Sequence, residues 1–191
     1  MAYHHGDLAK ALVEAGLDVT RSGGPAALTV RDVARRVGVS ANATYRHYPD
    51  RAALLHAVSG AIQQRMADVM ADIPQTSPTE RLRAVGLGYI AFALTEPGWF
   101  TTCFFGEHSP GPDELAQIPP YRALSTALDA MVDAGLVAPD DRDGATWSCW
   151  SMVHGFAELA LRGPLSRLTG EQQWPYAEKA VDAAIAGIVR R

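Results

Sequence analysis

The chain has 191 residues, of which 48% are hydrophobic and 20% are charged, and its formal net charge is −4. This composition excludes a disordered chain, and the length allows a core that is stable without disulfides or bound metals. No apolar run is long enough to span a membrane, and the first residues lack the basic and apolar segments of a signal peptide. With only two cysteines, Cys103 and Cys149, we expect a cytoplasmic globular protein without a disulfide framework or a zinc site.

The charge is distributed unevenly along the chain. Residues 1–51 hold seven Lys and Arg against five Asp and Glu, a net charge of +2, whereas residues 52–191 carry −6. Within residues 29–51 the net charge is +3. A basic segment in an acidic chain indicates where an anionic partner would bind.

The first 50 residues predict three short helices. Apolar residues at helical spacing occur over residues 6–21, and Ser22-Gly23-Gly24-Pro25 ends this helix. Thr29 is suited to cap a second helix that Gly38 ends, and Ser40 is suited to cap a third, very short one. The three helices together form a candidate N-terminal unit.

The rest of the chain also reads as helical. Asp50 can cap a fourth helix that runs to about residue 72. Further helices are predicted over residues 79–95, 119–135, 141–162 and 174–190. An aromatic-rich stretch covers residues 99–105, and no alternating pattern is long enough for a strand. The predicted fold class is therefore all-α.

The second and third predicted helices match the helix-turn-helix plan, with Gly38 in the turn. In that plan one helix crosses the DNA backbone and the next presents its N-terminal residues to base edges in the major groove. Asn42 can pair with adenine, and the methyl groups of Ala41 and Ala43 can contact a thymine methyl. Three residues are suited to phosphate oxygens: Ser40, Tyr45 and His47. Asn42 can equally be an ordinary surface residue.

Two segments carry a family resemblance. Leu28-Thr29-Val30-Arg31-Asp32-Val33-Ala34-Arg35-Arg36-Val37-Gly38-Val39-Ser40 and Tyr45-Arg46-His47-Tyr48-Pro49-Asp50-Arg51 resemble the DNA-binding domain of the TetR family of transcriptional regulators. The start, His4-His5-Gly6-Asp7-Leu8, is similar to a subset of that family. Trp150-Ser151-Met152-Val153-His154-Gly155 resembles the Trp-His-Gly motif of one type of TetR C-terminal domain.

The resemblance implies a homodimer that binds a double-stranded, palindromic DNA operator. Residues 1–51 would form a three-helix DNA-binding head, and residues 52–191 a larger helical body for ligand binding and dimerisation. A small-molecule effector in the body would loosen the DNA complex. The residues expected to contact DNA are Thr29, Arg31, Ser40, Ala41, Asn42, Ala43, Thr44, Tyr45, His47 and Arg51.

Several of these positions have a second interpretation or depart from the family. Thr29 can serve simply as an N-cap. Thr44 stands where the family often has an apolar residue, so it can belong partly to the core. Tyr48 replaces the usual Phe, so its hydroxyl needs a partner or water. Arg51 replaces the usual Lys and keeps the phosphate-binding charge.

The predicted helix 141–162 is apolar over about 240° of its circumference, whereas packing against one core needs only about 100°. We therefore expect it to be buried on two sides, against its own core and, together with the last helix, against a partner subunit. The predicted dimer interface consists of Cys149, Met152, Phe156, Ala160, Val181, Ala184, Ile185 and Ile188. A large monomeric core is the alternative.

Aromatic side chains of the body, with His154 as a polar group, can form the largely apolar effector pocket that the resemblance implies. The predicted pocket residues are Trp99, Phe100, Phe104, Phe105, Tyr121, Met131, Trp147, Trp150 and His154. The same aromatic residues can be plain core, and His154 can be a core histidine bonded to a backbone carbonyl. Which face of helix 141–162 meets the partner stays open.

Catalytic motifs are missing from the sequence. It contains no nucleophile elbow, phosphate loop or metal-ligand spacing, and we expect no enzyme activity, cofactor or metal. The predicted function is a ligand-responsive DNA-binding regulator, a repressor released by a small, largely apolar effector. The alternative is an all-α carrier or scavenger of small molecules with only non-specific affinity for DNA.

Overall fold

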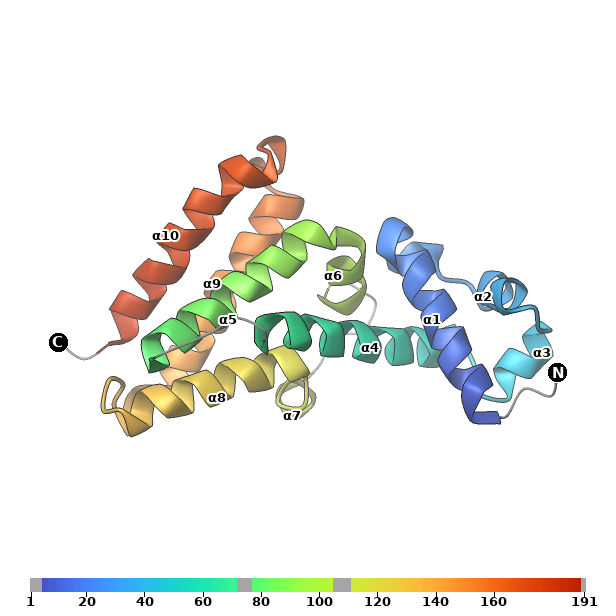
Figure 1. Ribbon diagram of the computed structural model, residues 1–191, viewed down its shortest axis with the longest axis horizontal. Coiled ribbons are helices and arrows are strands. Elements are labelled where there is room, and N and C mark those ends of the chain that lie inside the picture. The colour runs from blue at the N-terminus through green and yellow to red at the C-terminus, as the bar shows by residue number, and fades with distance from the viewer. Residues whose placement is uncertain (1–4, 72–76, 105–110, 190–191) are drawn as a thin grey trace. The chain divides into compact units, whose positions relative to one another are not determined.

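The computed structural model describes residues 5–71, 77–104 and 111–189, with only the backbone described for residues 5–7 and 112. In these ranges the chain forms helices and contains no strand (Figure 1), which confirms the predicted all-α class. The chain divides into two compact units. The first, here called the head unit, comprises residues up to 64 together with 96–109, and the second, the body unit, comprises 65–95 and 110–191.

The head unit contains α1 (His5–Gly23), the 3-10 helix η1 (Pro25–Ala27), α2 (Val30–Val37), α3 (Ala41–Tyr45), the first part of α4 (Arg51–Ala71) and α6 (Pro97–Phe104). Its core is apolar, with Leu12, Leu28, Val33 and Leu54 fully buried. The helix boundaries follow the capping residues that the sequence predicts. Gly38 ends α2 in the left-handed region, at φ 78°, where glycine carries no steric penalty.

Helix α6 was predicted only as an aromatic stretch, and it packs within the head unit against α1. The indole N–H of Trp99 donates to the carbonyl oxygen of Leu17 at 2.8 Å. A Cβ at Gly98 would lie 2.1 Å from the carbonyl oxygen of Arg21, so only glycine fits at this close approach of the two backbones. An ion pair between Arg21 and Glu96 adds a further link.

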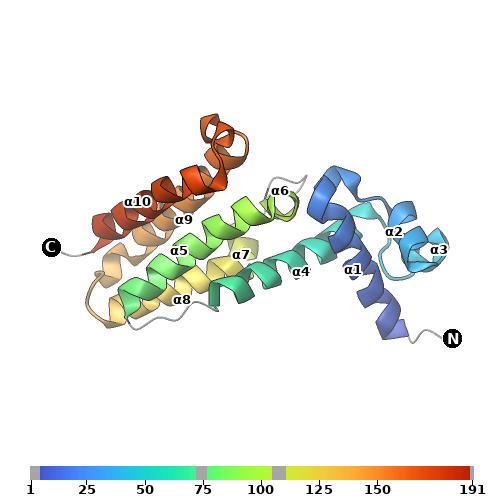
Figure 2. The same ribbon diagram turned by 45° about the horizontal axis from the view of Figure 1, so that its top comes forward.

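The body unit contains the end of α4, α5 (Pro78–Thr95), α7 (Pro112–Leu115), α8 (Pro119–Asp133), η2 (Pro139–Asp141), α9 (Arg142–Leu161), η3 (Pro164–Arg167) and α10 (Gly170–Ile188). Helix α5 packs against α8, α9 and α10, and α9 lies beside α10 (Figure 2). None of the described helices combines the length and the apolarity that a membrane crossing requires.

The start of the last helix differs from the sequence prediction. Helix α10 begins at Gly170, four residues before the expected residue 174. Thr169 and Gln172 form a capping box, in which each side chain accepts a hydrogen bond from the other residue's backbone N–H. This cap starts the helix early and leaves Pro175 inside it, beyond the first turn that the sequence suggested.

Candidate functional site

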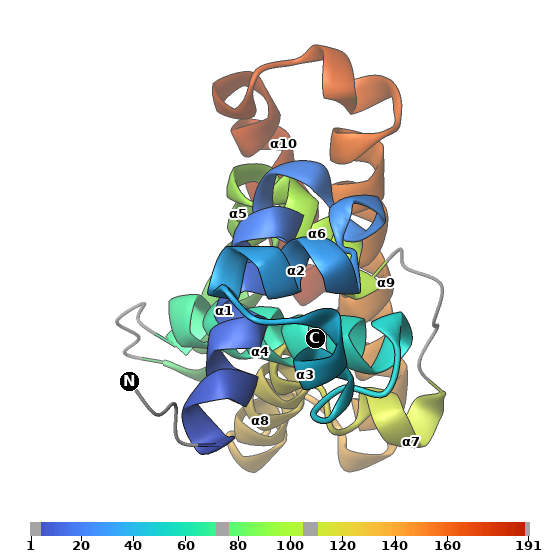
Figure 3. The ribbon, with the colours of Figure 1, turned by 90° about the vertical axis from the view of Figure 1, so that its right-hand side faces the viewer.

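Most of the predicted DNA-contact residues lie on or next to helices α2 and α3, which pack against each other in the head unit (Figure 3). Among these residues, Arg31, Asn42 and Tyr45 are exposed. The ring of Tyr45 is 46% exposed, although a tyrosine of a small domain normally has a mostly buried ring. Thr29 and Ser40 are also exposed, whereas Ala41, Ala43 and His47 are partly so.

Hydrogen bonds at the helix starts fix the positions of two hydroxyl groups. The Thr29 side chain accepts from the backbone N–H of Asp32 at 3.1 Å, and that of Ser40 accepts from the N–H of Ala43 at 3.2 Å. The N-cap interpretation of Thr29 is therefore confirmed. Capping uses the hydroxyl oxygen as acceptor, so the hydroxyl hydrogen can still be donated to an anion.

The charge on α2 is partly neutralised within the helix. Asp32 forms ion pairs with Arg35 and with Arg36. Hydrogen bonds from the Arg36 and Arg35 guanidinium groups lower the pKa of the Asp32 carboxyl group. The basic segment therefore presents less unpaired positive charge than its composition suggests.

Two of the predicted DNA-contact residues have contacts inside the head unit. Thr44 is fully buried, so its side chain belongs to the core of the head unit and cannot reach a base. Arg51, the first residue of α4, donates from Nε to the carbonyl oxygen of Leu28 at 2.9 Å and from Nη2 to that of Pro25 at 2.5 Å. These bonds direct its guanidinium group toward the segment that enters α2.

The Tyr48 hydroxyl, for which the sequence analysis expected a partner or water, bonds to a backbone group. The hydroxyl donates to the carbonyl oxygen of Ala9 in α1 at 3.3 Å. Partial burial raises the pKa of Tyr48. Through this bond the end of the α3 segment is attached to α1.

The body unit encloses a small apolar cavity of about 20 Å³. Its lining comes from α4, α5, α8, α9 and α10, and consists of Met70, Leu82, Val85, Gly86, Tyr89, Pro120, Leu124, Cys149, Trp150, Met152, Val153, Val181, Ala184 and Ile185. Only Trp150 of this set was among the predicted pocket residues.

The other predicted pocket residues are dispersed. Tyr121 contacts the edge of Trp150, with ring centroids 5.3 Å apart, and His154 stacks on Trp150 at 5.8 Å. Met131 is fully buried, but Trp147 is 50% exposed. Trp99, Phe100 and Phe104 belong to the head unit, and Phe105 lies outside the described residues.

Tyr89 is one of the cavity residues that the sequence analysis missed. It is almost fully buried, and its Oη lies 2.8 Å from Nδ1 of His154, with which it shares a hydrogen bond. Burial lowers the pKa of His154, and the negative charge of Glu158 partly opposes this. The two partners are 65 positions apart in the chain, so no local pattern could have revealed the pair.

The predicted dimer-interface residues lie mostly inside one protomer. Cys149, Met152, Val181, Ala184 and Ile185 line the cavity, Phe156 and Ala160 are buried, and Ile188 is partly exposed. A side chain buried in its own protomer has little surface left for a partner. The outward face of α9 carries instead Trp147, Ser148, Ser151, Gly155 and Leu159.

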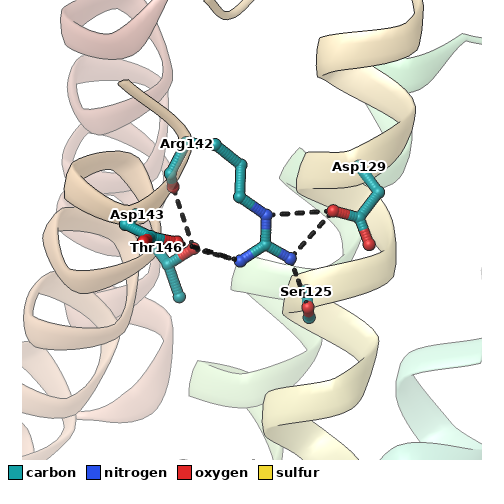
Figure 4. Close-up of polar contacts among 5 residues, drawn as sticks. All are labelled: Ser125, Asp129, Arg142, Asp143 and Thr146. Atoms are coloured by element: carbon teal, nitrogen blue, oxygen red, sulfur yellow. Dashed lines mark hydrogen bonds and ion pairs between the residues drawn. The ribbon is translucent and has the colours of Figure 1, made fainter. Parts of the chain in front are cut away.

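Arg142 of α9 links this helix to α8 through hydrogen bonds to two α8 side chains (Figure 4). Arg142, the first residue of α9, donates from Nε and Nη2 to Oδ1 of Asp129, at 2.9 and 2.8 Å. Its Nη2 also donates to Oγ of Ser125 at 2.5 Å. Because Ser125 directly follows the cavity residue Leu124, these bonds hold one wall of the cavity in place.

Two family models match the chain. The model described as bacterial regulatory proteins, tetR family, matches residues 12–58. The model described as tetracyclin repressor-like, C-terminal domain, matches residues 82–184, which is compatible with the Trp-His-Gly type. No curated protein matches the chain.

Solved structures share the fold. A protein of unknown function from Rhodococcus sp. RHA1 is 23% identical, with all of both chains covered and a TM-score of 0.79. A TetR transcription regulator from Haloarcula marismortui is 19% identical, with 97% of this chain and 100% of that chain covered and a TM-score of 0.73. A TetR regulator from Streptomyces coelicolor is also 19% identical, with 94% and 96% covered and a TM-score of 0.71. At these identities the likeness concerns the fold.

Proposed function

Because this chain belongs to the tetR family of bacterial regulatory proteins, which bind DNA and regulate transcription without catalysing a reaction, we propose that it is a homodimeric repressor. A small, largely apolar effector would release it from a palindromic operator. The observation that carries this proposal is the α2–α3 face, on which Arg31, Asn42 and Tyr45 stand exposed beside the capped start of α3. A DNA-binding role also implies the compartment that holds bacterial DNA, the cytoplasm.

On this face, we assign the reading of bases to the first turn of α3. Asn42 would pair with adenine, and Ala41 and Ala43 would contact thymine methyl groups. Tyr45 and His47 would bind phosphate oxygens, which fix the register of the protein on the duplex. Thr29 and Ser40 would donate their hydroxyl hydrogens to phosphates while continuing to cap their helices.

Two glycines on the outside of the body unit support the homodimer. Gly155 in α9 and Gly187 in α10 are exposed, and a Cβ at either would meet nothing within 4 Å. A glycine inside a helix costs about 1 kcal/mol relative to alanine, and among the described residues no close neighbour requires glycine at either position. A helix of a second copy that approaches closely would do so, in a four-helix contact with twofold symmetry.

For repression, the two heads of the dimer would enter successive major grooves, about 34–36 Å apart. An effector can change this spacing only if it binds more tightly to a conformation with a different spacing. In such a regulator, effector and operator weaken each other's binding reciprocally, by about 1–3 kcal/mol. A carrier protein with only non-specific DNA affinity would show no such coupling.

Fluorescence anisotropy tests the proposal directly. The full chain is titrated onto labelled DNA from upstream of its own gene and onto a scrambled duplex, at about 150 mM salt. We expect the native DNA to bind about 10³-fold more tightly or better, and Asn42→Ala to reduce this ratio. Equal, weak binding to upstream and scrambled duplexes, unchanged in Asn42→Ala, would instead favour the carrier.

A further inference from the structure

The cavity of the body unit is small but built from adaptable side chains. Its volume of about 20 Å³ is enough for about one water molecule, and an apolar space of this kind stays dry. Met70 and Met152 form part of the lining, and unbranched methionine side chains re-pack readily. The cavity can therefore enlarge around an apolar ligand through side-chain rearrangement.

A hydrogen-bonded polar pair borders the cavity, whose own lining surface is apolar. Tyr89, which lines the cavity, shares its 2.8 Å hydrogen bond with His154, and the ring of Trp150 lies against both residues. A phenol and a neutral imidazole can each donate or accept a hydrogen bond. The pair can therefore adjust to a hydroxyl or to a carbonyl group of a ligand.

The electrostatics of this region disfavour a charged ligand. Within the described residues, none of the side chains that line the cavity is charged. Burial lowers the pKa of His154, which favours its neutral form, and the negative charge of Glu158, one helical turn away, partly opposes this. A buried ligand charge would lack a counter-ion, which makes its transfer from water unfavourable.

The residues of the Trp-His-Gly motif lie partly at the cavity and partly on the outside of α9. Trp150 lines the cavity and His154 is hydrogen-bonded to the cavity residue Tyr89, whereas Gly155, the residue after His154, is exposed. One short segment of α9 thus takes part both in the cavity wall and in the outward face.

We propose that the Tyr89–His154 pair recognises the single polar group of an uncharged, otherwise apolar effector whose body fills the enlarged cavity. This inference rests on the proposed ligand responsiveness of the body unit. The Tyr89–His154 pair would be the recognition pair, and the ligand class would be a neutral lipophilic alcohol or carbonyl compound.

Three probes with the same carbon chain test the ligand class on the unmodified, full-length protein: 1-octanol, octanoate and octylammonium. Differential scanning calorimetry at increasing probe concentration gives each apparent Kd, because a ligand of the folded state raises Tm. We expect octanol to raise Tm, and both charged probes to bind at least about tenfold more weakly. Similar binding of all three probes, or no binding of octanol, would overturn the inference.

Two tyrosine variants test the recognition pair. Tyr89→Phe should weaken octanol binding about tenfold, because the ligand hydroxyl loses a buried partner. Tyr176→Phe, at a tyrosine that is 54% exposed on α10, is the matched control and should bind octanol like the unmodified chain. Equal affinities of the two variants contradict the role of Tyr89.

Anisotropy on DNA without probe is measured separately. If the unmodified protein binds its operator but not octanol, this inference is rejected while the proposed DNA-binding function stands.

Discussion

The predicted DNA-binding face and the cavity are held by different kinds of contact. In the head unit, Thr29, Ser40, Tyr48 and Arg51 bond to backbone groups, and Asp32 adds ion pairs with two arginine side chains of α2. Around the cavity, Tyr89 bonds to the side chain of His154, and Arg142 binds the side chains of Asp129 and Ser125 (Figure 4).

The difference has a physical consequence. When a side chain bonds to a backbone group, only one of the two partners can change rotamer, so fewer rearrangements break the contact. Two side chains bonded to each other can separate by rotamer changes, and a ligand can take the place of one partner. A rigid face suits the reading of a duplex of constant geometry, whereas exchangeable contacts suit a site that must enlarge for a ligand.

The strongest test of the rigid head is Gly98→Ala. The added Cβ would lie 2.1 Å from the Arg21 carbonyl oxygen and 2.6 Å from that of Thr20, and neither backbone group can rotate away. We expect a loss of about 3 kcal/mol in the free energy of unfolding, measured by urea denaturation. Gly60→Ala is the control, because a Cβ there meets nothing within 4 Å. This helix-interior variant should gain up to about 1 kcal/mol, and equal effects of the two variants would contradict the close approach of α1 and α6.

The next largest effect is expected for Arg51→Gln. The variant loses the two hydrogen bonds from the guanidinium group to the carbonyl oxygens of Leu28 and Pro25, and we expect it to be less stable by about 2 kcal/mol. Amide exchange should become faster at the start of α2. Arg51→Lys keeps the charge but not the paired geometry, so it should restore little of this stability.

DNA binding separates this role of Arg51 from the phosphate contact that the sequence suggested. On a random-sequence duplex, losing one phosphate contact reduces the slope of log Kd against log salt by about 0.9. We expect Arg51→Gln to leave this slope unchanged. A reduced slope would show that Arg51 binds DNA and would place it with the exposed residues of the face.

The sequence predicted contacts between residues close in the chain well and contacts between distant residues poorly. The N-caps of α2 and α3 act over three residues, so spacing alone revealed Thr29 and Ser40. The boundaries of α5 and α9 were also close to the prediction, because helical periodicity is local. Arg51 and Trp99 bond to residues 23 and 82 positions away, and a periodic pattern contains no information on such pairs.

The body was harder to predict for the same reason. The apolar circumference of α9 did not reveal which helices of the body unit, α5, α8 and α10, pack against it. Cys149 and Val181 proved to line a cavity inside the protomer. Tyr89 was not predicted as a site residue because it lies within an almost wholly apolar stretch of α5. In such a stretch no polar neighbour marks one residue as functional.

A smaller and opposite effect is expected for Thr44→Val. The Oγ1 atom of Thr44 is buried and has no hydrogen-bond partner among the described residues, and valine has nearly the same shape. Removing the hydroxyl should stabilise the head by about 1 kcal/mol without changing DNA affinity. Thr20→Val is the matched control, because the buried Thr20 hydroxyl donates to Gly16 at 2.9 Å. Weaker DNA binding by Thr44→Val would return Thr44 to the DNA-contact set.

The smallest expected effect is a pH dependence that arises at the cavity edge. Burial lowers the pKa of His154 in the folded state below its value in the unfolded chain, about 6.5. As the pH falls through that value, the unfolded state takes up the proton first, so stability falls. Calorimetry between about pH 7.5 and 5.5 should show a smaller decrease in Tm for His154→Gln than for the unmodified chain.

Tyr89→Phe identifies the cause of this pH dependence. The phenylalanine ring preserves the burial of His154 but removes its 2.8 Å hydrogen bond. Because burial is the main reason for the lowered pKa, the decrease in Tm on acidification should persist in this variant. If it disappears instead, the hydrogen bond rather than desolvation keeps His154 neutral. The Tyr89–His154 hydrogen bond would then be strong. The contrast between a rigid DNA-binding face and an adaptable cavity would in that case be wrong.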